Sequence, residues 1–187
     1  MFQTRGVGKG DRVCLFLPNC PEFLFCWFGL SALGAISVPI NTAYKRDETA
    51  YILNDAGAKA LVAHDSLLAV ARQAALLAPG VQLRLVVGDD SPLQTGESGW
   101  AGFSEALAKS DVTAARPEVS PQDISMLVYT SGTTGNPKGV MVTHQMYVAA
   151  GQGFAHWTQA TPEDRFFTCL PYYHANIQYY STMGSLA

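Results

Sequence analysis

The residues best suited to chemistry lie between positions 129 and 139, in the sequence Tyr-Thr-Ser-Gly-Thr-Thr-Gly-Asn-Pro-Lys-Gly. This segment combines three glycines and four aliphatic hydroxyl groups with a single cation, Lys138. Glycines let backbone N–H groups converge on an anion, hydroxyls donate further hydrogen bonds, and a lysine adds a mobile positive charge. No Asp or Glu that would repel an anion occurs between Asp123 and Glu163. The segment is therefore predicted to bind a polyphosphate.

The spacing differs from that of the common P-loop, in which the fifth residue after the first glycine is a glycine that is followed directly by lysine. Here the fifth residue after Gly132 is Pro137, and Lys138 is followed by Gly139. The alternative interpretation is an ordinary Gly/Thr turn between two strands. We favour phosphate binding because so many hydroxyls and glycines, together with a lysine, exceed what a turn requires.

Residues 129–139 closely resemble the signature loop of the adenylate-forming superfamily, which includes acyl-CoA synthetases, adenylation domains of peptide synthetases and luciferases. In that family the loop surrounds the β- and γ-phosphates of ATP while a carboxylate attacks the α-phosphate, giving an acyl-adenylate and pyrophosphate. By position, the resemblance implies an ATP-contacting set that consists of Thr130, Ser131, Gly132, Thr133, Thr134, Gly135 and Lys138. The catalytic members, which would orient the leaving pyrophosphate and stabilise its charge, are Lys138, Thr133 and Thr134.

A second resemblance begins where the apolar segment 164–170 ends. In the family, a strand ends at this point in a proline, aromatic residues and a histidine beside the acyl-binding pocket. The implied substrate-binding residues are Tyr172, Tyr173 and His174. Such a cluster suits an apolar or aromatic acid, and Asn176 and Gln178 are further candidates for contacts with polar groups of the substrate. The alternative is a packed aromatic corner whose histidine is simply hydrogen-bonded.

Alternating strands and helices are predicted to position these two segments. We expect strands at 12–17, 36–40, 60–63, 83–87, 124–129, 140–142 and 164–170, and helices at 21–33, 47–55, 66–78, 103–108 and 144–157. This alternation predicts an α/β fold with a layered, largely parallel sheet and flanking helices. Thr143 is the expected N-cap of the last helix. We interpret His144 as structural, with a phosphate contact at the helix N-terminus as the alternative.

The composition argues against several classes of protein. A chain of 187 residues that is 48% hydrophobic can form one or two domains with a real core. Its formal net charge of -3 gives no reason to expect nucleic-acid binding. The four cysteines have the spacing of neither a metal knuckle nor a redox pair, so we expect reduced thiols in a cytoplasmic protein. The uncharged segment 23–40 is interrupted by Gly34 and Pro39, so we predict no integral membrane segment.

Further matches at 8–13, 17–19, 34–41 and 51–55 extend the resemblance over essentially the whole chain and favour an acyl-CoA synthetase. Such an enzyme converts a carboxylic acid, ATP and CoA into acyl-CoA, AMP and pyrophosphate with the help of Mg²⁺. An adenylation domain that passes the acid to a carrier protein, and a non-catalytic remnant that binds nucleotide or a partner, remain the alternatives.

Several parts of the family pattern have no counterpart in these 187 residues. They are the magnesium-binding glutamate, the ribose-binding aspartate, the hinge, and the carboxy-terminal domain with its catalytic lysine. We therefore expect residues 1–187 to be a partial N-terminal domain that binds ATP and the acyl group, without the C-terminal domain and inactive alone. A truncated surface of this kind would favour self-association through an exposed sheet edge.

Overall fold

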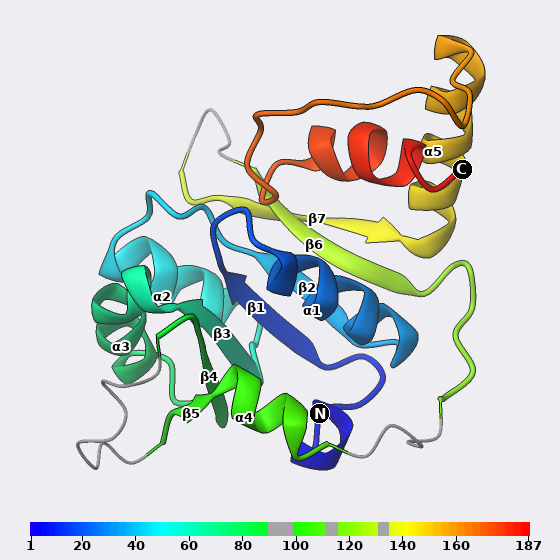
Figure 1. The fold of residues 1–187 in the computed structure, drawn as a ribbon. Coiled ribbons are helices and arrows are strands. Elements are labelled where there is room, and N and C mark those ends of the chain that lie inside the picture. The colour runs from blue at the N-terminus through cyan, green and yellow to red at the C-terminus, as the bar shows by residue number, and fades with distance from the viewer. Residues whose placement is uncertain (90–98, 111–115, 131–134) are drawn as a thin grey trace.

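The computed structural model describes residues 1–89, 99–110, 116–130 and 135–187, which form one sheet with helices on both faces (Figure 1). The strand order is β5-β4-β3-β1-β2-β6-β7. The strands are β1 (Arg12–Phe16), β2 (Ile36–Pro39), β3 (Ala60–His64), β4 (Leu83–Val87), β5 (Ala101–Gly102), β6 (Ile124–Thr130) and β7 (Lys138–Thr143). The pairs from β5 to β6 are parallel, and β7 runs antiparallel to β6. The predicted largely parallel α/β fold is confirmed.

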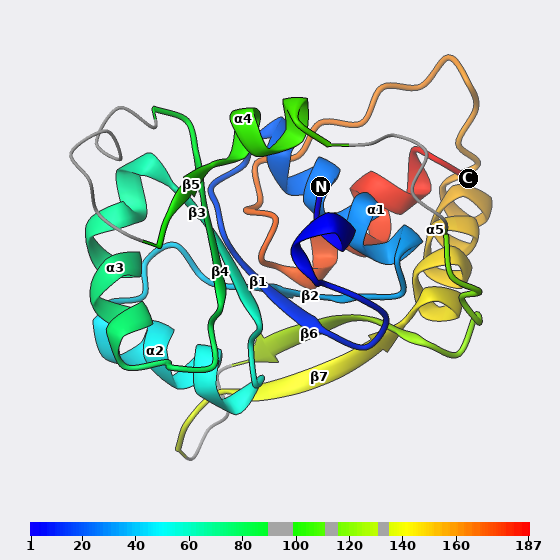
Figure 2. The same ribbon diagram turned by 90° about the horizontal axis from the view of Figure 1, so that it is seen from below.

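The helices divide into two layers, which bury the two faces of the sheet. They are α1 (Pro21–Ala32), α2 (Arg46–Asp55), α3 (Leu68–Leu76), α4 (Phe103–Ala108) and α5 (His144–Thr158), together with short 3-10 helices at Gln3–Arg5 and Asp65–Leu67 and a π-helix at Ile177–Thr182. One hydrophobic core lies under α1, α4 and α5, and a second lies under α2 and α3. Figure 2 shows α2 and α3 on one side of the sheet and α1 and α5 on the other.

Local signals explain where α1 and α5 begin. Pro21 occupies the first turn of α1, where its missing N–H costs nothing, and Gly34 follows the helix with a φ of 65°. The Thr143 side chain caps α5 by accepting a hydrogen bond from the Met146 N–H at 3.2 Å, as predicted. Among the residues that the structure describes, no helix has both the length and the apolar character needed to cross a membrane.

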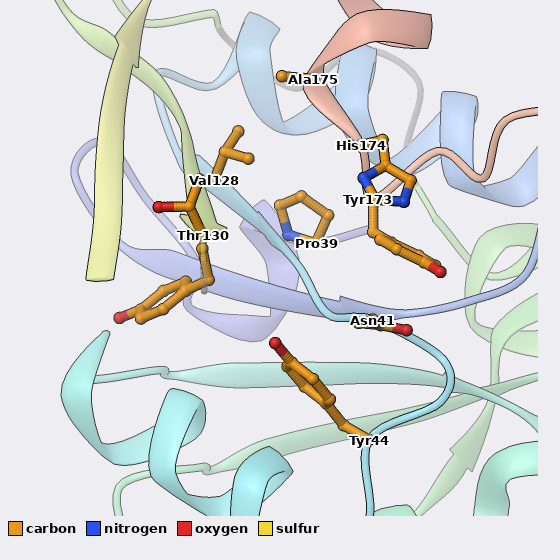
Figure 3. Close-up of a pocket in the computed structure, with 9 residues that line it drawn as sticks. Pro39, Asn41, Tyr44, Val128, Thr130, Tyr173, His174 and Ala175 are labelled. Atoms are coloured by element: carbon orange, nitrogen blue, oxygen red, sulfur yellow. The ribbon is translucent and has the colours of Figure 1, made fainter. Parts of the chain in front are cut away.

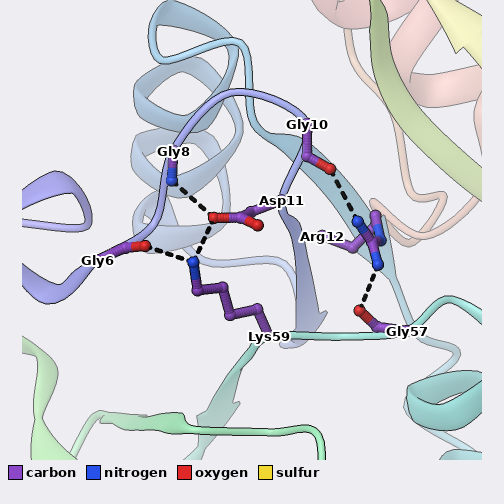
Figure 4. A network of polar contacts seen from close by, with 7 residues as sticks. All are labelled: Gly6, Gly8, Gly10, Asp11, Arg12, Gly57 and Lys59. Carbon is purple, nitrogen blue, oxygen red and sulfur yellow. Dashed lines mark hydrogen bonds and ion pairs between the residues drawn. The ribbon is translucent and has the colours of Figure 1, made fainter.

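A polar network connects the N-terminal segment to Lys59, which directly precedes β3 (Figure 4). The Lys59 ammonium donates to the Gly6 carbonyl at 2.6 Å and pairs with the Asp11 carboxylate at 2.7 Å. Asp11 also accepts from the Gly8 N–H, and although burial raises its pKa, these donors hold the pKa of Asp11 below its usual value. The Arg12 guanidinium donates to the carbonyls of Gly10, Ala56 and Gly57.

One expectation about the secondary structure is wrong, and one short strand was not predicted. Residues 164–170 form no strand, and Phe167 is 92% exposed, because no neighbouring strand among the described residues offers hydrogen bonds to this segment. The short strand β5 was not anticipated, since two residues carry no periodic pattern. The cysteines are free thiols, as expected, with Cys14 and Cys26 buried and Cys169 exposed.

Candidate functional site

The antiparallel pair β6–β7 brings together the two ends of the predicted phosphate-binding segment. Thr130, the last residue of β6, is paired with Lys138, the first residue of β7, and both side chains are exposed. Gly135 lies between them in the sequence, with a φ of 99° that an L side chain rarely adopts. A hydroxyl and an ammonium group at one end of a strand pair are donors that suit a phosphate. The predicted contacts of Ser131, Gly132, Thr133 and Thr134 lie outside the described residues.

A cluster of hydroxyls and one carboxylate anchors the base of this segment to α2. The Tyr129 hydroxyl donates to Asp55 Oδ2 at 2.6 Å. The Tyr51 hydroxyl lies 3.2 Å from the Pro137 carbonyl oxygen and 3.3 Å from Asp55 Oδ1. Burial, reinforced by the Asp55 carboxylate, raises the pKa of Tyr129. Sequence reasoning missed this cluster, although the spacing of Tyr51 and Asp55 places both on one face of a helix.

Gly139 leaves room for the ring of Tyr129, whose hydroxyl is bonded to Asp55. A Cβ atom at position 139 would lie 3.2 Å from Cζ of the Tyr129 ring, closer than side chains normally pack. The third glycine of the segment therefore has a packing role, since the ring of Tyr129 lies against its backbone.

A cleft of about 310 Å³ adjoins Thr130 at the carboxyl ends of β2 and β6 (Figure 3). Its lining residues are Pro39, Asn41, Tyr44, Val128, Tyr129, Thr130, Tyr173, His174 and Ala175. Figure 3 shows Val128 and Thr130 on one side of the cleft and Tyr173 and His174 on the other. The rings of Tyr173 and His174 are 4.6 Å apart, centroid to centroid. Ligands of open α/β sheets bind outside the carboxyl ends of the strands, and this cleft has that position.

The other predicted residues of the aromatic segment do not line the cleft. Tyr172 stacks on Phe23 of α1, with ring centroids 5.0 Å apart and an interplanar angle of 16°. Asn176 is exposed and is not a lining residue. Gln178 is 0% exposed, and both ends of its amide are hydrogen-bonded within the core. The hypothesis that Gln178 contacts the substrate directly is therefore wrong in this structure.

His144 lies at the far end of β7 from Lys138. The two residues are six positions apart along β7 and its end, which is about 20 Å at the rise of an antiparallel strand. Burial lowers the pKa of His144, although the Asp123 carboxylate opposes this shift. The structural interpretation of His144 is therefore favoured over a contact with the same phosphates.

The described residues also indicate which ligands the site fits. The exposed donors Thr130 and Lys138 suit the phosphates of ATP. Within the described ranges, no group of three or more His, Cys, Asp or Glu side chains could hold a metal ion. The Asp55 carboxylate, which is hydrogen-bonded to Tyr129 of β6, already accepts hydrogen bonds from two tyrosine hydroxyls.

Comparison with known proteins tests the resemblance over the full chain. The family model described as "AMP-binding enzyme" matches residues 1–187. The chain is 36% identical over 191 residues to the crotonobetaine/carnitine–CoA ligase of Citrobacter koseri, and 36% identical over 188 residues to the ligase of the same name from Escherichia fergusonii. Each match covers 100% of this chain and 36% of the relative, so the chain spans about a third of the length of these relatives.

Solved structures agree with the sequence comparison. A long-chain-fatty-acid–CoA ligase from Archaeoglobus fulgidus superposes with a TM-score of 0.81 at 30% identity, covering 99% of this chain and 34% of that one. An anthranilate CoA ligase in complex with anthranoyl-AMP gives a TM-score of 0.74 at 31% identity, covering 81% of this chain and 28% of that one. Since the family model, the relatives and the fold all agree with the signature segment at 129–139, the chain belongs to the AMP-binding, adenylate-forming enzyme family.

Proposed function

We propose that this chain provides the phosphate-binding and acid-binding parts of a cytoplasmic, ATP-dependent carboxylic acid–CoA ligase. The observation that carries the proposal is the double position of Thr130. This residue pairs with Lys138 at the end of β6–β7 and also lines the cleft that contains Tyr173 and His174. The phosphate donors and the aromatic cleft therefore adjoin, as they must if a carboxylate is to meet the α-phosphate of ATP.

The reaction that fits this arrangement has two steps. A carboxylate oxygen of the acid attacks the α-phosphorus of ATP, and the bond to the bridging oxygen breaks, so that pyrophosphate leaves with the electron pair. The thiol of CoA then attacks the acyl carbonyl, loses its proton, and displaces AMP. In the first step Lys138, with the hydroxyls of Thr130, Ser131, Thr133 and Thr134, stabilises the charge on the departing pyrophosphate.

The cleft favours an acid with an apolar or aromatic body. Tyr44, Tyr129 and Tyr173 supply aromatic surface, and Asn41 and His174 supply a few polar groups that can fix orientation. Relatives whose names specify a carnitine derivative, an aromatic acid and a long-chain fatty acid show that the family accepts different acids. The identity of the acid therefore depends on side chains around the cleft.

The 187-residue chain alone should form no measurable acyl-CoA. It spans about a third of the length of its curated relatives, and the magnesium-binding glutamate and the catalytic lysine that the family resemblance implies have no counterpart in residues 1–187. Incubation of the isolated chain with acids, ATP, Mg²⁺ and CoA, followed by mass spectrometry for acyl-CoA, tests this expectation. Detection of the thioester would contradict it.

The role of Lys138 is tested in a protein that joins this chain to the remaining length of its relatives. Lys138→Ala should slow acid-dependent ATP–pyrophosphate exchange by about 100-fold or more, the typical loss when a charge-stabilising group is removed from a transition state. Lys109→Ala is the matched control, because Lys109 is exposed and forms an ion pair with Glu105, four residues earlier in the chain. Unchanged exchange in Lys138→Ala would remove Lys138 from the mechanism. Transfer of the acid to a carrier-protein thiol in place of CoA would identify a peptide-synthetase adenylation domain.

A further inference from the structure

We propose that Gln178 is a positioning residue for the acid-binding side of the cleft. Its buried amide holds the Tyr172 carbonyl and thereby fixes the turn that presents Tyr173 and His174. The kinetic part of this inference rests on the proposed ligase function, whereas its structural part does not.

Gln178 is a fully buried polar side chain with a partner at each end. Its Nε2 donates to the Tyr172 carbonyl oxygen at 2.5 Å, and its Oε1 accepts from the Tyr147 hydroxyl at 2.5 Å. Tyr147 is 3% exposed, and its hydroxyl also lies 3.1 Å from the Met126 sulfur of β6. A buried amide is costly unless its partners stay in place, so this chain of bonds connects β6, α5 and the aromatic segment rigidly.

The Tyr172 backbone is held on both of its polar groups by side chains. The Asn19 Oδ1 accepts from the Tyr172 N–H at 2.8 Å, while the Asn19 Nδ2 donates to the Leu170 carbonyl at 2.9 Å. The Gln178 amide donates to the Tyr172 carbonyl. The Tyr172 N–H belongs to the peptide that joins Pro171 to Tyr172, and the Tyr172 carbonyl belongs to the peptide that joins Tyr172 to Tyr173. Because each peptide unit is planar, Asn19 constrains the first of these two peptides and Gln178 constrains the second.

The peptide that joins Tyr172 to Tyr173 is the middle of the turn that faces the cleft. The His174 N–H donates to the Pro171 carbonyl at 3.0 Å, which closes the turn across residues 171–174. The orientation of the central peptide therefore sets the directions of the Tyr173 and His174 side chains, both of which line the cleft. Tyr172 itself is directed away, onto Phe23, so it fixes the turn from the core side.

The helix that carries Gln178 supports the same interpretation. Gln178 is the second residue of the π-helix Ile177–Thr182, a rare form that occurs often near functional sites. The helix packs closely against α5, where Gly151 leaves room for the Met183 backbone. Gln178 and Tyr147 are thus held at fixed separation by two elements in direct contact.

The test compares variants that differ in whether they release the Tyr172 carbonyl. Gln178→Met removes both hydrogen bonds of the amide at similar side-chain length. Tyr147→Phe is the matched control, because it removes a buried hydrogen bond of the same network but keeps the bond from Gln178 to Tyr172. Asn54→Ala is a second control, since Asn54 also bonds two backbone carbonyls, those of Ala50 and Leu77, away from the cleft.

The structural readout is the NMR signal of the His174 imidazole in this chain, which the nearby Tyr173 ring shifts. We expect Gln178→Met to move these signals toward the values of an unfolded peptide, and Tyr147→Phe and Asn54→Ala to leave them in place. Asn19→Ala replaces an exposed side chain, removes the hydrogen bond to the Tyr172 N–H and should move the same signals. It is the substitute variant if Gln178→Met does not fold. Unmoved signals in Gln178→Met, or in Asn19→Ala if only that variant folds, would overturn the inference.

The kinetic readout is the KM for the acid, measured in the protein that joins this chain to the remaining length of its relatives. Gln178→Met should raise the acid KM about tenfold, since small misplacements of positioning groups have large kinetic effects, and leave the KM for ATP unchanged. Equal acid KM values for Gln178→Met and Tyr147→Phe would overturn the positioning role. A wild-type protein without ligase activity would refute the proposed function alone, because the NMR comparison still decides the role of Gln178.

Discussion

Two glycines in α5 should respond oppositely to the same substitution. Alanine is favoured over glycine in a helix interior by about 1 kcal/mol, and this gain applies equally at positions 151 and 153. At Gly151, however, a Cβ atom would lie 2.6 Å from the Met183 carbonyl oxygen and 2.7 Å from its carbonyl carbon. At Gly153, the added Cβ meets no described atom within 4 Å apart from its chain neighbours and the backbone of its own helix. The substitution therefore creates a backbone collision at one position and only the helix gain at the other.

The collision at position 151 cannot be relieved by a side-chain rotation, because the atoms met belong to the backbone of Met183. Overpacking of this kind costs about 1–3 kcal/mol, so Gly151→Ala should lose up to about 2 kcal/mol of unfolding free energy once the helix gain is subtracted. Gly153→Ala should gain about 0.5–1 kcal/mol. In a chain of this size, about 1 kcal/mol moves the melting temperature by about 2–4 °C.

Thermal melts and urea titrations of the two variants and the wild type provide the measurement. We expect Gly151→Ala to melt below the wild type and Gly153→Ala above it. If both variants shift by the same amount, the close approach of α5 and the π-helix is not what the structure indicates. A Gly151→Ala variant more stable than the wild type would refute the reasoning outright.

Three further predictions concern ionisable groups. The pKa of Tyr129 is raised in the folded state, so the neutral phenol adds stability below pH about 10, and this stability is lost as the pH rises further. The unfolding free energy, measured by denaturant titration, should therefore fall less steeply at alkaline pH in Tyr129→Phe than in the wild type. The pKa of Asp11 is lowered in the folded state, so its carboxylate adds stability above pH about 4, and this stability is lost as the pH falls. Lys59→Met should make the unfolding free energy depend less on pH in the acid range, and the same dependence as in the wild type would contradict the Lys59–Asp11 pair. Native protein should react rapidly with a thiol reagent at the exposed Cys169. The two fully buried thiols, Cys14 and Cys26, whose pKa is raised by burial, should react only after unfolding; fast reaction of either in the native state would contradict the packing of the cores.

Most of the fold could be predicted because apolar runs in this chain end at strong local signals. Helix α4 has its predicted bounds, and α1 and α5 begin where Pro21 and Thr143 indicate. The prediction of a strand at 164–170 was wrong for a reason that lies outside the segment. Its apolar pattern is typical of a strand, but a strand also needs a neighbour for its hydrogen bonds, and no local pattern specifies that neighbour.

The candidate site was predictable where one continuous motif carries it and less so where distant residues meet. Thr130 and Lys138 come together because they flank one short segment. The contact between Tyr129 and Asp55 joins residues 74 positions apart, so no local pattern could indicate it. Gln178 was misassigned because an amide is as suitable for a core network as for a substrate contact, and only the position of Tyr147 distinguishes the two.

The two edge strands of the sheet differ in how well they could pair with a further strand. At one edge, β5 is only two residues long and therefore offers few free backbone groups to a further strand. At the other edge, β7 is six residues long, has no partner on its outer side among the described residues, and exposes Val140 and Met141. A strand added to this sheet would therefore pair with β7 rather than with β5. An eighth strand there would lie against the strand that begins at Lys138, so extension of the sheet would bring new residues beside the proposed phosphate site.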